Sequence, residues 1–209
     1  HYVIMATKMG QVKKTSLEQY SRPRSNGINA ITIKDDDELL EAKLTNGNSQ
    51  IMLAVKSGKA IRFEENKTRP MGRNASGVRG IRLKDDKDEV VGMISVIDMD
   101  ANILVVSENG FGKRTPIEDY RMTNRGGQGV ANIECSARNG PVVASYVASE
   151  DDQIMLVTNS GKLIRIRVQG GEGDSIRVAG RKTQGVRLFD VDDEEKVVSV
   201  ALLTESDEE

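Results

Sequence analysis

The sequence predicts an all-β, propeller-like protein with about four blades of short strands. Three observations support this fold class. A hairpin glycine recurs about every fifty residues, as Gly10, Gly58, Gly110 and Gly161. A second glycine follows each hairpin and opens a further apolar run, at Gly27, Gly77, Gly129 and Gly185. A polar, mostly acidic turn and another apolar run complete each repeat, and four short strands at this period are typical of propeller blades.

Each repeat is expected to form two strands around the first glycine, a third strand after the second glycine, and a fourth after the acidic turn. The first repeat uses VIMAT, QVKKTSL, INAITIK and LLEAKL. The second begins with IMLAV and KAIRF, the third with ILVVS and KRTPI, and the fourth with IMLVT and KLIRIRV. Asn-Gly between two apolar runs, as at Asn109-Gly110, is a strong hairpin signal because both turn residues must tolerate a positive φ. The runs are short and rich in Val and Ile, which disfavours a helical solenoid.

The repeats set the expected domain organisation. One repeat domain should cover residues 1–202, with blades at about 1–47, 48–99, 100–149 and 150–202. Residues 203–209 form an acidic tail, which could fold back on basic loops or simply be solvated. The chain starts at His1 inside an expected strand, so we expect a fragment of a longer protein.

Composition limits the class of protein further. The chain has 209 residues, of which 37% are hydrophobic, 30% charged and 3% aromatic, so Val, Ile, Leu and Met must build the core. No apolar run approaches the roughly 20 residues that span a bilayer, so no membrane association is expected. The single cysteine, Cys135, cannot form an intramolecular disulfide, which indicates a reducing, intracellular compartment.

The loops between the second and third strands are the candidate binding elements, because each of them carries arginine. In an antiparallel blade the hairpin and acidic turns should share one end, and the arginine loops should lie at the other. One basic cluster per blade would then suit the phosphate backbone of long duplex nucleic acid. The predicted contacts are Arg22, Arg24, Arg69, Arg73, Arg79, Lys113, Arg114, Arg121, Arg125, Arg177, Arg181, Lys182 and Arg187.

A second basic position lies on the second strands, where Lys113 and Arg114 are accompanied by Lys13, Lys14, Lys162 and Arg165. These side chains either contact the ligand or point outward from half-exposed strands, and the sequence does not decide between the two. The scarcity of aromatic residues argues against single-strand recognition by base stacking.

The sequence contains no recognisable catalytic, metal or cofactor site. Its only histidine is His1, and Cys135 has no histidine partner for nucleophilic catalysis. Asp98, Asp100 and Asn102 resemble the start of an EF-hand loop, but the required glycine and bidentate glutamate are absent. The acidic turns at 35–38 and 190–195 are expected to be solvated, with a loosely held divalent ion as the alternative.

Several motifs resemble one known family. VIMATKMGQVKKTSLEQY, SGVRGIRL, ENGFGKRTPIEDY, NRGGQGV, DQIMLVTNSGKLIR and VAGRKTQGV are similar to the carboxy-terminal domain family of bacterial DNA gyrase A proteins. The resemblance extends from Tyr2 to about Leu203. Asn124 to Gly129 are similar to the glycine-arginine box of the family's first blade, but lie in the third repeat here and lack two of its basic residues. We interpret them as the repeat equivalent of that box.

The resemblance implies a β-pinwheel, usually of six blades, of which the first two would be missing here. Its basic perimeter wraps duplex DNA non-sequence-specifically for negative supercoiling by an ATP-dependent type II topoisomerase. The implied partners are the gyrase B protein and the cleavage domain of the same gyrase A polypeptide, in an A2B2 heterotetramer in the bacterial cytoplasm, associated with the nucleoid. Mg²⁺ and ATP would belong to the holoenzyme, and this segment would be non-catalytic.

Two alternatives remain open. The homologous protein of topoisomerase IV is the nearest relative to exclude, and a propeller-type protein-interaction platform is the rival from another class. A propeller hydrolase would need clustered acids and histidines, which the sequence lacks.

Overall fold

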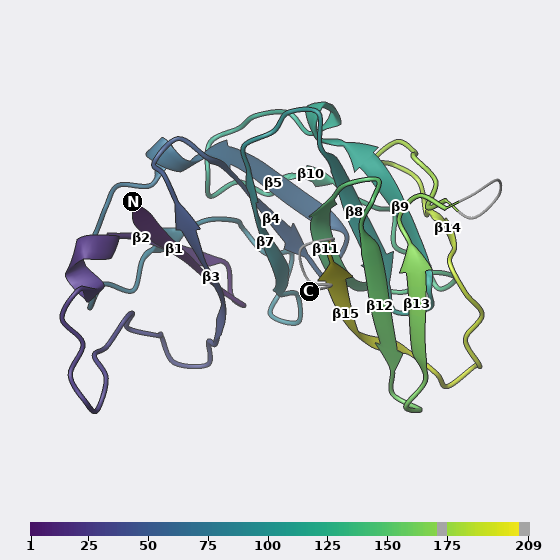
Figure 1. Ribbon diagram of the computed structural model, residues 1–209, viewed down its shortest axis with the longest axis horizontal. Coiled ribbons are helices and arrows are strands. Elements are labelled where there is room, and N and C mark those ends of the chain that lie inside the picture. Colours follow the sequence, from purple (N-terminus) through teal and green to yellow (C-terminus); the bar gives the residue numbers. More distant parts are fainter. Residues whose placement is uncertain (171–174, 205–209) are drawn as a thin grey trace. The chain divides into compact units, whose positions relative to one another are not determined.

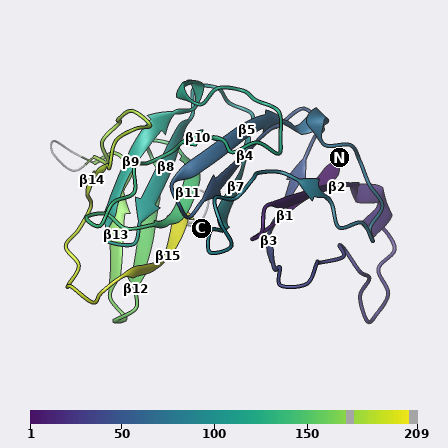
Figure 2. The same cartoon turned by 180° about the vertical axis from the view of Figure 1, so that it is seen from behind.

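The computed structural model describes residues 1–170 and 175–204 and shows an all-β chain, as predicted (Figures 1 and 2). Most of the GGEG run and the predicted acidic tail beyond Thr204 lie outside the described residues. The chain divides into two compact units. The first comprises His1–Val55, Ala60–Ile97 and Arg121–Val130, and the second Lys56–Lys59, Asp98–Tyr120 and Ala131–Glu209.

The first unit contains two four-stranded sheets, with strand orders β3-β1-β2-β6 and β10-β5-β4-β7. The strands of the first sheet are β1 (Tyr2–Thr7), β2 (Gln11–Ser16), β3 (Leu39–Thr45) and β6 (Val78–Arg79). Those of the second are β4 (Gln50–Val55), β5 (Lys59–Glu64), β7 (Val90–Val96) and β10 (Val130–Ala131). Short 3-10 helices, η1 (Leu17–Tyr20) and η2 (Glu65–Lys67), follow β2 and β5.

The second unit contains a four-stranded sheet of order β11-β8-β9-β14 and a three-stranded sheet of order β13-β12-β15. The strands of the larger sheet are β8 (Asn102–Ser107), β9 (Phe111–Pro116), β11 (Val142–Ala148) and β14 (Val186–Arg187). Those of the smaller are β12 (Gln153–Thr158), β13 (Leu163–Arg167) and β15 (Val197–Leu203). The 3-10 helix η3 (Ile117–Asp119) follows β9.

The outermost strand of each four-stranded sheet comes from the next repeat. β6, β10 and β14 belong to repeats two, three and four, yet they pair in the sheets of repeats one, two and three. The predicted blade ranges therefore describe the sequence repeat, whereas the sheets exchange a strand across each boundary. The sequence does not predict this exchange, because a periodic pattern does not show in which sheet a strand pairs.

The strand-opening glycines explain how the exchange is possible. A Cβ at Gly77 would lie 2.3 Å from the Val12 carbonyl oxygen, and one at Gly129 would lie 2.3 Å from that of Ala60. Both glycines have positive φ, a left-handed backbone conformation that glycine adopts readily. They adopt it where the chain contacts the second strand of the preceding repeat. Gly27 also has positive φ, but no atom lies within 4 Å of its Cβ position.

The prediction of a strand at INAITIK is wrong, since residues 28–34 form no strand. In the other repeats the corresponding segment pairs with the sheet of the preceding repeat. The described residues contain no sheet that precedes β1. The 28–34 segment lies instead along the following repeat, where Thr32 donates its amide to the Ala75 carbonyl and its hydroxyl to the Asn74 carbonyl.

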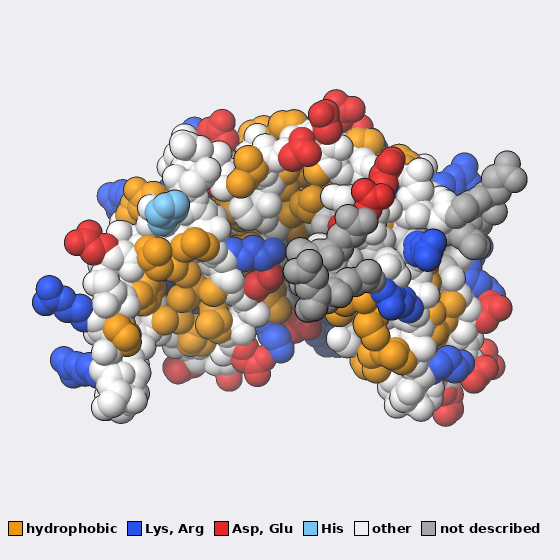
Figure 3. All heavy atoms as spheres, viewed as in Figure 1, with side chains coloured by type: hydrophobic (Ala, Val, Ile, Leu, Met, Phe, Trp, Pro, Cys, Tyr) orange, Lys and Arg blue, Asp and Glu red, His pale blue; other side chains and the backbone are white. Residues whose placement is uncertain are grey.

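Each unit has its own apolar core, made mostly of aliphatic residues. In the first unit the cluster includes Ile4, Val12, Leu53, Ile61, Phe63 and Met93. In the second it includes Leu104, Val106, Ile154, Leu156, Val168 and Val200. Outside these clusters, hydrophobic side chains are exposed on the first sheet near His1 (Figure 3), where Leu39 and Leu44 of β3 are 44% and 61% exposed.

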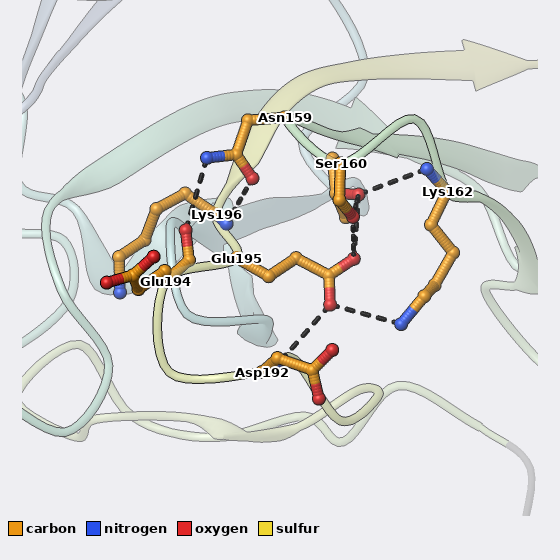
Figure 4. Close-up of polar contacts among 8 residues, drawn as sticks. Asn159, Ser160, Lys162, Asp192, Glu194, Glu195 and Lys196 are labelled. Atoms are coloured by element: carbon orange, nitrogen blue, oxygen red, sulfur yellow. Dashed lines mark hydrogen bonds and ion pairs between the residues drawn. The ribbon is translucent and has the colours of Figure 1, made fainter.

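The acidic turns are tied to the hairpin turns, which confirms that the two turns share one end of a blade. Met9 donates its amide to the Asp37 carboxylate. In the fourth repeat the buried Glu195 carboxylate accepts from the hydroxyls of Thr158 and Ser160, the Lys162 ammonium and the Asp192 amide, at 2.7 to 3.1 Å (Figure 4). The two hydroxyls, then the Asp192 amide and Lys162, lower the pKa of Glu195 to about 2.

Gly77→Ala should destabilise the protein more than Gly27→Ala. Both positions have positive φ, which costs a non-glycine residue about 1–2 kcal/mol. Only at Gly77 would the new methyl group meet a carbonyl oxygen, at 2.3 Å. Urea unfolding of both variants measures the difference. Equal losses would contradict the role of close backbone approach.

Glu195→Gln should destabilise the protein at neutral pH and lose its effect in acid. The unfolded carboxyl has a pKa of about 4.3, and the folded value is about 2. Because the folded pKa is lower, the stabilisation is complete above about pH 4.5 and declines as the pH falls toward 2. Thermal unfolding of wild type and variant from pH 7 to about pH 2.5 tests this. A constant difference in Tm across that range would refute it.

Candidate nucleic-acid interface

The arginine loops run beside the far halves of the second strands, at the end of the blade predicted for them. A backbone amide of each loop donates to a second-strand carbonyl of the preceding repeat: Met71 to Lys14, Thr123 to Arg62, and Ala179 to Arg114, at 2.7 to 2.9 Å. These acceptors occupy the same register position in β2, β5 and β9. The loops are therefore docked in the same way three times.

The predicted contact residues fall into three classes of exposure. Most of them are exposed on the described surface: Arg22, Arg24, Arg69, Arg79, Arg121, Arg177, Lys182 and Arg187. Three are half-buried: Arg73, Arg125 and Arg181. Two are buried, Lys113 at 0% and Arg114 at 4% exposure. The exposed class can reach a phosphate without rearrangement. The predicted place is wrong for Arg79 and Arg187, because they pair with Gln11 and Phe111, the first residues of β2 and β9 beside the hairpin turns. Arg187 is also paired with Asp190 at 2.7 Å.

The three half-buried arginines occupy one position, four residues before a strand-opening glycine. Each donates to a carbonyl of the preceding repeat, located two residues after that repeat's own glycine. Arg73 Nη1 binds Asn29 O at 2.7 Å, Arg125 Nη1 binds Arg79 O at 2.8 Å, and Arg181 Nη1 binds Ala131 O at 3.0 Å. Arg125 and Arg181 also donate from Nε, to the carbonyls of Lys67 and Asp119.

Lys113 and Arg114 do not fit the predicted place on a DNA-facing surface. The Lys113 ammonium donates to Gly180 O, Arg181 O and Thr183 Oγ1 at 2.5 to 3.1 Å. Arg114 Nε donates to Ile176 O at 2.8 Å. Both side chains hold the arginine loop of the next repeat from inside. Desolvation by burial, and then the charge of Arg181, lowers the pKa of Lys113 to about 8.

The other cations of the second strands are either buried, like Lys113, or exposed. Lys13 is buried at 1% exposure and donates to Ala30 O and Arg73 O. Lys14 is buried with Glu65, 3.5 Å away, and lies over the Tyr2 ring. Lys162 and Arg165 are exposed. Neither interpretation of the second basic position, direct contact or an outward-facing strand residue, fits Lys13 and Lys14.

Sequence reasoning missed the internal role of these lysines and of two tyrosines. The Tyr20 hydroxyl donates to Ala30 O at 2.9 Å, and the Tyr120 hydroxyl contacts Asn132 Oδ1 at 2.5 Å. The available signal was the spacing of lysine and tyrosine, since KKTSLEQY and KRTPIEDY place them seven residues apart in repeats one and three. Sequence reasoning missed Arg82 as well. It is exposed, and its amide donates to Gly127 O in an arginine loop.

Clustered metal ligands and membrane-spanning helices are both lacking in the described part of the chain. Among residues 1–170 and 175–204, no group of three His, Cys, Asp or Glu side chains is arranged to hold a metal ion. No helix within the same ranges is long and apolar enough to cross a bilayer.

A family model described as "DNA gyrase C-terminal domain, beta-propeller" matches residues 1–46, 50–97, 101–140 and 152–204. Similar curated proteins carry the name of the A component of DNA gyrase. One from Staphylococcus epidermidis is 42% identical over 99% of this chain and 23% of its own length. One from Salmonella typhimurium is 45% identical over 97% of this chain and 22% of its own length. The chain thus spans about a quarter of the length of these relatives.

Two solved structures share the fold. The C-terminal domain of DNA topoisomerase IV has a TM-score of 0.87 at 28% identity, covering 96% of this chain and 61% of that chain. A DNA gyrase A C-terminal domain has a TM-score of 0.82 at 26% identity, covering 97% of this chain and 66% of that chain.

Lys113 should titrate near pH 8, well below the value of about 10.4 for a free lysine side chain. Because the folded pKa is the lower one, the unfolded state binds more protons between about pH 8 and 10.4. Stability should therefore rise with pH in that window, while the cost of the buried charge is fully present below about pH 8. NMR titration of the Lys113 side chain gives the midpoint. A midpoint near 10.4 would show that the three acceptors outweigh desolvation.

Proposed function

Because the chain belongs to the DNA gyrase C-terminal domain family, we propose that it binds duplex DNA without reading its sequence and bends the duplex along its arginine loops. The observation that carries the proposal is the repeated docking of these loops. In three successive repeats the same backbone bond fixes the loop, and exposed cations such as Arg69, Arg121 and Arg177 stand on it.

The chemistry of these loops suits phosphate rather than bases. Arg can bind a phosphate with two parallel N–H donors, and Lys acts as a mobile point charge. Such contacts position a duplex and carry no sequence information. Only 3% of residues are aromatic, and Phe111 and Tyr120 are buried, so the chain offers few stacking platforms for single strands.

Bending the duplex requires several loops to act together. Elastic estimates give a cost of about 1–6 kcal/mol for bending 20–30 base pairs by 40–90°. Each neutralised phosphate releases counterions and contributes about 0.9 to the slope of log affinity against log salt. Single contacts cannot offset the bending cost, whereas the docked loops of one unit can engage successive phosphates of one duplex.

In the whole protein this module would serve an ATP-dependent type II topoisomerase of the bacterial cytoplasm that introduces negative supercoils. Its partners would be duplex DNA in the nucleoid, the cleavage domain of the same polypeptide, and the gyrase B protein in an A2B2 assembly. Mg²⁺ and ATP would act in those other parts, and this chain would contribute DNA geometry and no catalytic group.

Arg69→Ala and Arg121→Ala should each weaken binding to a duplex of about 100 base pairs and lower the salt slope by about 1. Lys87→Ala, which removes an exposed cation from an acidic turn, is the matched control and should change neither quantity. Gel shifts with long and short duplexes at several salt concentrations provide the measurement.

The same assay separates the proposal from its rival. If wild type does not shift duplex DNA, or shifts it with no salt dependence, the proposal is wrong and the result favours the rival, a protein-interaction platform. If Lys87→Ala weakens binding as much as the loop variants, binding is a diffuse charge effect and the loops have no special part in it.

A further inference from the structure

The arginine loop of the fourth repeat is fastened by a row of residues on β9. Arg114 takes the Ala179 amide on its carbonyl and donates from Nε to Ile176 O. The Thr115 hydroxyl donates to Ala179 O at 2.8 Å. The Lys113 ammonium also holds the loop, because it donates hydrogen bonds to Gly180 O, Arg181 O and Thr183 Oγ1. Residues 113–115 thus hold the described loop from Ile176 to Thr183.

Lys113 cannot itself contact a ligand. Its exposure is 0%, and its three N–H donors have three acceptors, which is the full capacity of an ammonium group. The exposed cations of the loop, Arg177 and Lys182, lie between the fastened points, next to Ile176 and Thr183 respectively. The backbone position of Lys182 therefore depends on a lysine that never reaches the surface, whereas that of Arg177 is fixed by Arg114, whose amide donates to Arg177 O.

Arg181 adds a second restraint from outside the sheet. Its Nε binds Asp119 O at 2.7 Å and its Nη1 binds Ala131 O at 3.0 Å, so one side chain bridges two segments of the preceding repeat. Lysine could not reproduce this bridge, because an ammonium group lacks the planar, spaced donors of a guanidinium.

The same arrangement occurs in the first unit. Lys13 binds Ala30 O and Arg73 O, and Arg73 binds Asn29 O. The second sheet has Ile61 at the position of Lys13, and a Cβ at Gly127 would lie 3.8 Å from its Cδ1 atom. Arg125 is still present there and binds Arg79 O. An arginine bond to the preceding repeat thus accompanies every docked loop, the two-point bridge accompanies the loops of Arg125 and Arg181, and the buried lysine accompanies two of the three.

We propose that Lys13, Lys113, Arg73, Arg125 and Arg181 are positioning residues for DNA binding, which fix the arginine loops in advance so that the exposed cations meet the phosphate backbone in register. The proposal rests on the DNA-binding function above. Ordering a loop on binding consumes affinity, and a loop that is fixed beforehand avoids this loss. Removal of one positioning residue should therefore weaken the phosphate contact made from the stretch of loop that it holds.

The test compares Lys113→Met and Arg181→Lys with the contact variants Arg177→Ala and Lys182→Ala in the 209-residue chain. Each contact variant should lower the salt slope by about 1 and leave amide exchange in residues 179–183 unchanged. Lys113→Met should lower the slope by about 1 although it removes no exposed cation, because Lys182 loses its fixed position, and should speed amide exchange in residues 179–183, which Lys182→Ala should not. Thr183→Val removes one acceptor of Lys113 and the hydroxyl donor to Gly180 O, and should act in the same direction with a smaller effect.

Arg181→Lys is the sharpest variant, because it keeps the charge and removes the bridge. It should weaken DNA binding as much as Arg181→Ala. Binding equal to wild type would show that Arg181 acts only as a charge and would overturn the proposal for the arginines. Faster loop exchange in Lys113→Met with an unchanged slope would overturn it for the lysines.

Two further outcomes are informative. If Lys113→Met does not fold, Thr183→Val and Arg181→Lys test the proposal on their own. If Arg177→Ala and Lys182→Ala leave binding unchanged while Lys113→Met speeds loop exchange, the loop is held as described but the assignment of this loop to DNA binding fails. That failure is distinct from failure of the positioning argument.

Discussion

The fold depends on the close approach of two backbones at the strand-opening glycine. At Gly77, Gly129 and Gly185 the chain lies against the second strand of the preceding repeat, where a Cβ would be only 2.3 to 2.7 Å from a carbonyl oxygen. This approach lets β6, β10 and β14 complete the sheet of the repeat before them. No complete sheet among the described strands is therefore formed by one repeat, except the three-stranded last one, and stability resides in neighbouring pairs, as in other repeat proteins.

Strand exchange also decides where the cations lie. Once the third segment of one repeat is docked on another, the carbonyls of the adjoining loop are enclosed and need donors. Lys113 and Lys13 supply them. Burial of an ammonium group is costly without compensation, but a hydrocarbon in its place would remove the lysine donor from Arg181 O and leave Gly180 O with the Thr183 hydroxyl alone. The three hydrogen bonds of the Lys113 ammonium offset part of its desolvation cost. The lowered pKa reflects the part that remains.

The sequence predicted the all-β class, the four repeats, the hairpin turns and the end of the blade that carries the arginine loops. These features depend on local rules, such as positive φ at Gly110 and short runs rich in Val and Ile. It could not predict strand exchange, because Gly77 and Gly27 look alike in sequence and differ only in what lies beside them. For the same reason Lys113 and Lys182 look equivalent in sequence, although one is buried and the other exposed. The sequence shows which side chains are charged, but whether a charged side chain is buried depends on how the neighbouring repeat packs against it.

This separation of cations reconciles the proposed DNA binding with a formal net charge of −2. Carboxylates such as Asp37 and Glu195 are bonded to the hairpin turns, at the end of a blade away from the arginine loops. A phosphate group interacts mainly with charges within about a Debye length, roughly 8 Å at physiological salt, so the net charge of the whole chain matters little. Affinity for the phosphate backbone then depends on the exposed cations of the arginine loops and on how firmly those loops are held. Within each unit the loops are fixed by bonds to the preceding repeat, so in the proposed complex the exposed cations would form a fixed set of charges to which the duplex adapts.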